Sequence, residues 1–137
     1  MCRDGWCVLQ PEPIVLYNAA RDGKLDEVKA AVDAGARMEW ANPGEGGSRA
    51  VHKASAYGHK DVVAFLGSRG ADVNAVTDNQ LTPLHLAAYS GKASVCTALL
   101  ALGADPAAKD KGGRTALDWA GERNEAECVA VLEAAMR

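Results

Sequence analysis

Residues 81–105 read LTPLHLAAYSGKASVCTALLALGAD, and this stretch decides the fold. Thr82 can cap a helix by accepting a hydrogen bond from a free backbone N–H, and Pro83 suits the first helical turn. The next residues place apolar side chains at i, i+3 and i+4 on one stripe of that helix: Leu84, Ala87 and Ala88. Gly91 can end the helix, and a second apolar helix follows it. The stretch therefore predicts two helices that bury a shared face against neighbouring units.

The same features recur along the chain at a nearly constant period. A Gly-Ala pair stands at Gly35-Ala36, Gly70-Ala71 and Gly103-Ala104, with spacings of 35 and 33 residues. A pair of small residues inside the first helix, and a Gly or Asn at the end of that helix, repeat with a similar spacing. Three markers with one period indicate stacked copies of a single structural unit.

The third copy resembles the ankyrin repeat family, whose unit of about 33 residues carries the signature T-P-L-H-x-A. Residues 82–87, Thr-Pro-Leu-His-Leu-Ala, match that signature in full. The resemblance covers residues 14–137 and implies an all-α solenoid of four helix-turn-helix units with hairpin turns between them. The expected repeats are 14–46, 47–79, 80–112 and 113–137, and residues 1–13 form an N-terminal extension.

The second unit departs from the family pattern at its first helix. Arg49-Ala50 replaces the Thr-Pro pair, so we expect Ser48 to serve as a shifted cap. The loop before it, residues 41–48, is two residues longer than its counterpart in the next unit and is rich in Gly and Pro. Gln80 replaces the turn glycine of the third unit, and we expect it to need a positive φ.

Composition limits the classes of function. The 137 residues are 24% charged and 48% hydrophobic, as in an ordinary folded protein. The net charge of −3 is spread evenly over both halves, so no basic surface for nucleic acid is indicated. No apolar run approaches the roughly 20 residues that span a bilayer, and the N-terminus lacks the apolar core of a signal peptide. We therefore expect a cytoplasmic or nuclear monomer that binds neither nucleic acid nor membrane.

The four cysteines fall into two groups. Cys96 and Cys128 lie in apolar helical patterns, which favours buried thiols acting as small hydrophobic side chains. Cys2 and Cys7 are spaced C-x4-C, with no second pair or nearby His to complete a zinc site. A thiol-based redox sensor or a metal site at Cys2 and Cys7 is nevertheless the alternative function. We expect no cofactor.

The histidines do not form a catalytic set. His52 and His85 stand 33 residues apart, at the same place in adjacent units. The resemblance implies a structural role there, with the imidazole bonded to backbone at the start of the helix. His59 follows a helix-closing glycine, and we expect it to be solvated. No H-x-x-x-H, C-x-x-C, G-x-S-x-G or phosphate-loop motif occurs, so we expect no enzymatic activity.

The resemblance implies that another protein binds the concave face, which hairpin tips and first helices form. The chain would then act as an adaptor, scaffold or inhibitor. The candidate partner-binding residues are Trp40, Glu45, Ser48, Tyr57, Asp78, Asn79, Leu81, Tyr89, Lys111, Arg114 and Arg123. Tyrosine and arginine are enriched at interface hot spots. The alternative for both tyrosines is that they fill grooves within the stack.

Three further residues carry separate expectations. Trp40 either anchors a partner or folds against Met38 or the N-terminal segment, where it would bury Trp6. Trp119 replaces Leu86, which continues an apolar run, so we expect Trp119 in the core. Asn74 follows Leu66 in the pattern Leu-x5-Asp-Val-Asn, which resembles ankyrin asparagines that an oxygen-dependent dioxygenase hydroxylates. The alternative is that Asn74 satisfies backbone groups of the hairpin.

Overall fold

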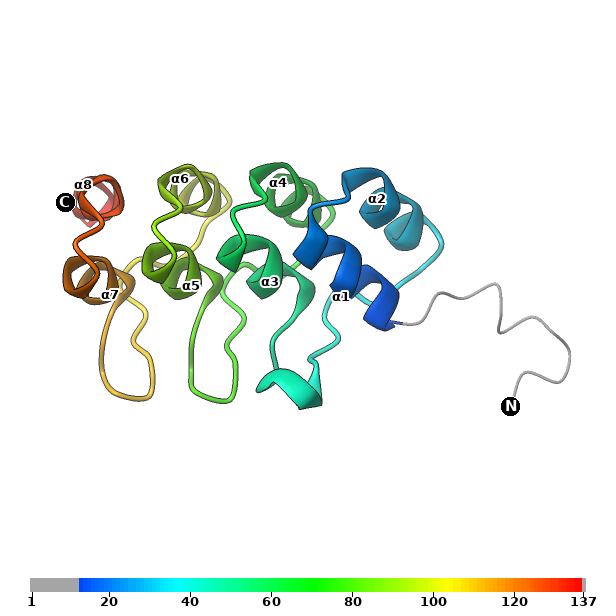
Figure 1. The fold of residues 1–137 in the computed structure, drawn as a ribbon, viewed down its shortest axis with the longest axis horizontal. Coiled ribbons are helices and arrows are strands. Elements are labelled where there is room, and N and C mark those ends of the chain that lie inside the picture. The colour runs from blue at the N-terminus through cyan, green and yellow to red at the C-terminus, as the bar shows by residue number, and fades with distance from the viewer. Residues whose placement is uncertain (1–12, 137) are drawn as a thin grey trace, which may run out of the picture.

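The computed structural model describes residues 13–136, which form eight α-helices in four antiparallel pairs (Figure 1). The pairs are α1 (Pro13–Asp22) with α2 (Leu25–Asp33), α3 (Ala50–Ala56) with α4 (Lys60–Ser68), α5 (Pro83–Tyr89) with α6 (Ala93–Ala101), and α7 (Ala116–Glu122) with α8 (Ala126–Ala135). The predicted all-α array of four helix-turn-helix units is thereby confirmed. No helix within the described residues is long and apolar enough to cross a membrane.

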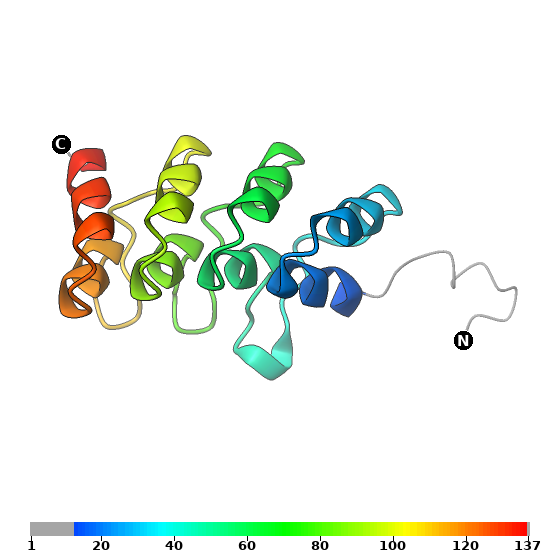
Figure 2. The same cartoon turned by 45° about the horizontal axis from the view of Figure 1, so that its top comes forward.

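The helices form two rows. The first helices, α1, α3, α5 and α7, lie side by side in one row, and α2, α4, α6 and α8 lie in the other (Figures 1 and 2). Three loops project from the first row, away from the second, and we call them the first finger (residues 41–48), the second finger (76–81) and the third finger (109–114). The first finger is the longest, and it contains a short 3-10 helix, Pro43–Glu45.

Caps start the first helices in two different ways. Thr82 Oγ1 accepts the backbone N–H of His85 at 3.2 Å, as the sequence predicts for α5. At α3 the capping position is Arg49, and its own N–H donates to His52 Nδ1 at 3.0 Å. The expectation that Ser48 caps α3 is wrong, because its hydroxyl donates instead to the carbonyl of Glu45 at 3.0 Å.

The turns require left-handed backbone where the repeat predicts it. Gln80 has φ 66° in the second finger, the conformation of Gly47 and Gly113 at the equivalent places. Asn124 has φ 57°, where the other units place a helix-closing glycine. Side chains other than glycine tolerate this region poorly, although Asn does so better than most. Both residues therefore carry backbone strain that glycine would remove.

The core runs the length of the stack between the two rows. Its fully buried leucines include Leu66 in α4, Leu84 in α5, Leu99 in α6 and Leu132 in α8. Alanines such as Ala54 and Ala87 are also fully buried, and they let the first helices approach one another closely. Cys96 and Cys128 are buried free thiols, which confirms their predicted place in the core.

Two histidines join the helices to the fingers. His52 Nδ1 accepts the Arg49 N–H, so Nε2 carries the proton and is shared between the carbonyls of Ala75, at 2.9 Å, and of Leu81 in the second finger, at 3.1 Å. His85 repeats the arrangement one unit later, with Nε2 2.9 Å from the carbonyl of Arg114. Their predicted structural role is confirmed. His59 is not simply solvated as expected, because it is half-buried and Nε2 donates to the carbonyl of Arg21 at 2.7 Å.

Candidate protein-binding face

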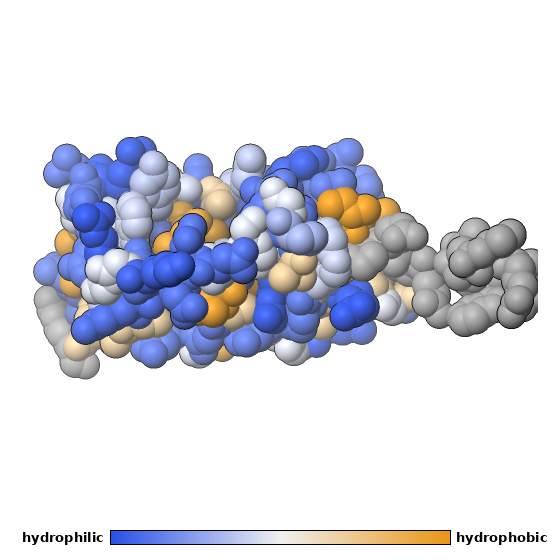
Figure 3. Space-filling model, turned by 90° about the horizontal axis from the view of Figure 1, so that it is seen from below, coloured by the Kyte–Doolittle hydropathy of each residue, from blue (hydrophilic) through white to orange (hydrophobic). Residues whose placement is uncertain are grey.

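The fingers and the first helices together form one continuous face. The backbone N–H of Asp78 donates to the carbonyl of Gly46 at 2.9 Å, which joins the first finger to the second. The N–H of Lys111 donates to the carbonyl of Asn79 at 3.0 Å, which joins the second finger to the third. Because neighbouring fingers are bonded to each other, the face is held in one shape before any partner arrives. Seen from the finger side, it is mostly hydrophilic, with small apolar patches (Figure 3).

A polar cluster of Tyr17, Glu45 and Lys53 occupies the first part of this face. The Tyr17 ring is buried in α1, and its hydroxyl donates to Glu45 Oε1 at 2.8 Å. Lys53 on α3 forms an ion pair with the same carboxylate. Lys53 and Tyr17 together hold the pKa of Glu45 below its ordinary value. Burial, with Glu45 adding to it, raises the pKa of Tyr17. The cluster fastens the long first finger to α1 and α3.

Trp40 packs beside this cluster. Its ring meets Tyr17 edge to face, with centroids 5.8 Å apart, and it is half-buried. Trp40 was predicted either to anchor a partner or to pack on Met38 or the N-terminal segment, and its contact with Tyr17 was part of neither prediction. Trp6 lies outside the described residues. Glu45 is exposed but already engaged by Tyr17 and Lys53. Ser48 is only 9% exposed, and its predicted role in partner binding stays a prediction.

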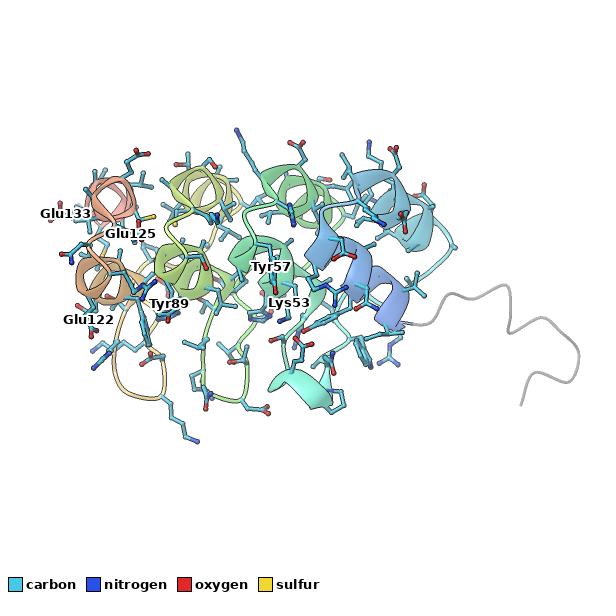
Figure 4. The ribbon with its side chains drawn as sticks, in the orientation of Figure 1. Lys53, Tyr57, Tyr89, Glu122, Glu125 and Glu133 are labelled. Carbon is cyan, nitrogen blue, oxygen red and sulfur yellow. The ribbon has the colours of Figure 1, made fainter. Side chains whose placement is uncertain are left out.

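Tyr57 is the most exposed aromatic side chain of the described region, at 54%. It does not fill a groove within the stack. Lys53 Nζ lies 5.9 Å from the centre of its ring, and Figure 4 shows the Lys53 side chain on α3 close to that of Tyr57, which follows the end of this helix. The Lys53 charge is neutralised by Glu45, and nearby Arg21 is paired with Asp22 at 3.0 Å. The charges around Tyr57 are thus satisfied within the chain.

The last two units place a second aromatic cluster on the face, formed by Tyr89, Trp119 and Arg123. Tyr89 on α5 is 43% exposed, and its ring meets Trp119 edge to face at 5.4 Å. The Arg123 guanidinium lies over the Tyr89 ring, 4.5 Å from its centre. Trp119 was expected in the core, and that expectation is wrong: it is half-buried and borders the face.

Trp119 borders the face because its position does: the counterpart Leu86 in the third unit is also half-buried and lines the same pocket. The indole N–H of Trp119 needs a partner there. Nε1 donates to Asp110 Oδ2 on the third finger at 2.8 Å, and the Arg114 guanidinium lies 5.4 Å from the ring centre. Arg114 also forms an ion pair with Glu122 at 2.7 Å. Burial acts to raise the pKa of Asp110, but the Arg114 N–H and the indole hold it below its ordinary value. The indole is therefore fixed in one orientation.

Two connected hollows lie at this cluster. An apolar pocket of about 260 Å³ is lined by Leu81, His85, Leu86, Tyr89 and Trp119. A broader and more polar hollow of about 420 Å³ adjoins it, and its lining residues are Asn79, Leu81, Asp110, Lys111, Gly112, Arg114 and Trp119. Leu81 and Trp119 belong to both, so the two hollows form one groove. Of the candidate residues in the last two units, Asn79, Leu81, Tyr89, Lys111 and Arg114 line the groove, and Arg123 stands beside it.

Sequence reasoning missed Tyr17, Trp119 and Asp110 as residues that shape this face. Tyr17 follows Leu16 in an apolar helical pattern, and a phenol there must find a hydrogen-bond partner. The same requirement applies to the indole of Trp119. This need for a hydrogen-bond partner was the signal that could have pointed to both residues, but the sequence did not indicate which carboxylate would accept the bond. Asp78, at the tip of the second finger, is exposed and stands apart from both clusters.

Asn74 lies away from these clusters, at the junction between the second and third units. Its side-chain nitrogen donates to the carbonyl of Gly103 at 3.2 Å, and its oxygen accepts the N–H of Asp105 at 2.7 Å. These bonds support the alternative in which Asn74 satisfies backbone groups of the hairpin. Asn74 is also exposed, and its hydroxylation stays a prediction.

The metal and thiol alternative receives no test from the structure. No group of three or more His, Cys, Asp or Glu side chains within residues 13–136 is arranged to hold a metal ion. Cys2 and Cys7 lie outside the described residues. A site at these two cysteines therefore stays a prediction.

Comparison with known proteins identifies the family. The family model described as "Ankyrin repeats (3 copies)" matches residues 69–135, and the one described as "Ankyrin repeat" matches residues 46–78. The chain is an ankyrin repeat protein. The first helix pair, α1 and α2, precedes the matched residues, and α1 packs on α3 as α3 packs on α5.

Three curated relatives show the range of proteins that contain similar repeats. The chain is 37% identical over 91 residues to mouse RelA-associated inhibitor, a match of 66% of this chain and 11% of that protein. It is 34% identical over 110 residues to E3 ubiquitin-protein ligase hecd-1 of Caenorhabditis elegans, covering 80% and 4%. It is 36% identical over 92 residues to mouse protein phosphatase 1 regulatory subunit 12A, covering 61% and 9%. The chain thus spans only a small part of each relative.

These comparisons support a general function. The ankyrin fold is a protein-interaction module, generally without catalytic activity, and two of these relatives are named as an inhibitor and a regulatory subunit. The ligase activity named for the third belongs to a protein of which the matched repeats form 4%. The chain is accordingly a module for binding other proteins.

Proposed function

We propose that this chain binds a partner protein across the face of the three fingers and the first helices, and acts as an adaptor, scaffold or inhibitor. One observation carries the proposal: the fingers are bonded to one another and the aromatic side chains of the face are held by neighbours before binding. A preformed surface loses little conformational freedom when a partner docks, so more of the contact energy appears as affinity.

The proposal extends to the setting of the interaction. The chain acts as a monomer in the cytoplasm or nucleus, and its partner is a protein rather than a nucleic acid or a membrane. The even charge distribution of the sequence supports this choice of partner. Sedimentation of the purified chain at micromolar concentration tests the monomer. A stable dimer would contradict it.

Site-specific photocrosslinking in cells of the source organism tests the binding face. A photoreactive phenylalanine replaces Tyr57 or Tyr89 on the face, and Ala64 or Ala101 on the outer row as matched exposed controls. We expect one specific protein to be crosslinked from positions 57 or 89 and not from the control positions. Crosslinks from the outer row alone would refute the proposed face.

A further inference from the structure

We propose that the groove between the third and fourth repeats is the main docking site, and that it takes a short acidic segment of the partner protein. One large apolar side chain of the segment enters the pocket between Tyr89 and Trp119. A neighbouring Asp or Glu of the segment pairs with Arg123. This inference rests on the proposed function and assigns the partner's chemistry.

The size of the groove fits a peptide segment. Its apolar pocket of about 260 Å³ is smaller than the roughly 300–1,000 Å³ of sites that enclose a whole small molecule. It can hold one large side chain against Leu81, Leu86 and the two aromatic rings. The adjoining polar hollow, of about 420 Å³, offers room for the main chain that carries this side chain.

The walls of the pocket are held in place before binding. Asp110 fixes the indole of Trp119 through a hydrogen bond, and Arg114 covers one side of the ring. Tyr89 is held between Trp119 and the guanidinium of Arg123. Fixed aromatic side chains bordering a pocket are typical of the centre of an interface, where a few residues carry most of the binding energy.

Charge decides the rest of the segment's chemistry. On the first half of the face, Lys53 and Arg21 are paired with Glu45 and Asp22. Beside the groove, Arg123 forms no ion pair with any residue of the described chain, and neither does Lys111 on the third finger. The Arg123 guanidinium lies 4.5 Å from the centre of the Tyr89 ring, and its side chain is exposed, so its N–H groups can reach a partner. A carboxylate, the anionic group of protein side chains, can pair with both of these cations.

The other end of the face lacks this combination. Tyr57 is more exposed than Tyr89, but the cation beside it, Lys53, already has a carboxylate partner. A partner carboxylate would have to displace Glu45 there and break its hydrogen bond with Tyr17. At the groove, a partner carboxylate meets an unpaired guanidinium and displaces nothing within the chain. The groove is therefore the favoured place for an acidic segment.

Selection from a phage-displayed library of random 12-residue peptides on the 137-residue chain tests the inference. We expect the selected peptides to share a Phe, Leu, Ile, Met or Trp within about two positions of an Asp or Glu. A fluorescent synthetic peptide of the selected sequence then gives the Kd. Trp119→Ala should raise Kd about 30-fold, and Tyr89→Ala and Arg123→Gln about 10-fold each. The matched controls at the other end, Tyr57→Ala and Arg21→Gln, should change Kd less than about twofold.

Salt and folding controls sharpen the outcome. Raising the salt concentration should weaken binding to the parent chain more than to Arg123→Gln, because the exposed ion pair is screened. Urea unfolding of each variant separates lost binding from lost folding. Arg123 is exposed, so Arg123→Gln decides the question even if Trp119→Ala lowers stability.

Three results would overturn the inference. They are no enrichment of any peptide, enrichment of peptides without the acidic residue, and binding that the groove variants leave unchanged. The crosslinking experiment tests the proposed function separately. A partner crosslinked from position 57 and not from 89 would leave that function standing and refute the groove. No crosslink from either position would refute both.

Discussion

Acidification from pH 7.5 to 5.0 should destabilise the fold largely through His52. The ring is fully buried, and burial lowers the pKa of His52 from 6.5 to about 4, although its bonds to the carbonyls of Ala75 and Leu81 oppose the change. Protonation would place a charge in the core. It would also consume the lone pair of Nδ1, which accepts the N–H of Arg49 at 3.0 Å. The neutral ring is thus the form that the folded chain requires.

The direction and the size of this loss of stability follow from the pKa of His52 in the unfolded and in the folded chain. The unfolded chain takes up a proton at His52 near pH 6.5, and the folded chain does so only near pH 4. The stability that the neutral ring contributes is therefore complete above pH 6.5 and is lost as the pH falls toward 4. The full contribution is about 3 kcal/mol, and about 2 kcal/mol of it is lost by pH 5.0. A loss of this size is a large fraction of the stability of a small domain.

Urea unfolding of the parent chain and His52→Gln, at pH 7.5 and at pH 5.0, measures the effect. Glutamine cannot titrate, so the parent should lose about 2 kcal/mol more than the variant over this interval. Carboxylates with lowered pKa, such as Glu45 and Asp110, contribute equally to both proteins and cancel in the comparison. Equal losses in the two proteins would refute the reasoning. So would an NMR titration of the His52 ring with a midpoint near pH 6.5, which also decides the matter if the variant does not fold.

Three further predictions concern the core, a turn and the buried thiols. Leu84→Ala should cost about 2–5 kcal/mol because Leu84 is 1% exposed, and Tyr89→Ala, at 43% exposed, should cost less than about 1 kcal/mol; equal costs in urea unfolding would contradict the assigned positions. Gln80→Gly should stabilise the chain by about 0.5–1 kcal/mol: it removes the cost of a φ of 66°, and part of this gain is lost because glycine gives the unfolded chain more conformational freedom. A lower melting temperature of the variant would argue against strain at Gln80. Burial raises the pKa of Cys96 to about 12 and the pKa of Cys128 above its ordinary value, so a thiol reagent at pH 8 should label both only on unfolding; rapid labelling of the native chain at either thiol would disprove this.

The parts of the fold that depend on short stretches of sequence could be predicted. The cap at Thr82, the strain at Gln80 and the backbone bonds of His52 all follow from residues within four positions or from the repeat itself. A helix cap joins a side chain to an N–H two or three residues away, so its partner can be read directly from the sequence. The repeat then places each such feature in three dimensions.

Contacts that depend on the course of a finger could not be predicted. Tyr17 and Glu45 are 28 positions apart, and they meet because the first finger folds back through its 3-10 helix toward α1. The helical pattern of the fourth unit suggested a buried Trp119, because Leu86 occupies the equivalent place in an apolar run. In both units this position borders the face, since Leu86 is half-buried as well, and Asp110, nine positions earlier on the third finger, accepts the indole N–H there. Periodicity states which residues are equivalent, but it does not state which polar partner each of them meets.

The two clusters on the face divide stability from binding along the array. Tyr17, Glu45 and Lys53 hold the longest finger, so a partner that paired with Glu45 or Lys53 would first have to break contacts that stabilise the chain. Breaking a partly buried charge pair leaves one charge without its partner, which opposes binding. Arg123 presents the opposite case, because it rests on Tyr89 and holds no carboxylate within the described chain. Binding energy should therefore concentrate at the third and fourth repeats, while changes in the first two repeats act mainly on stability.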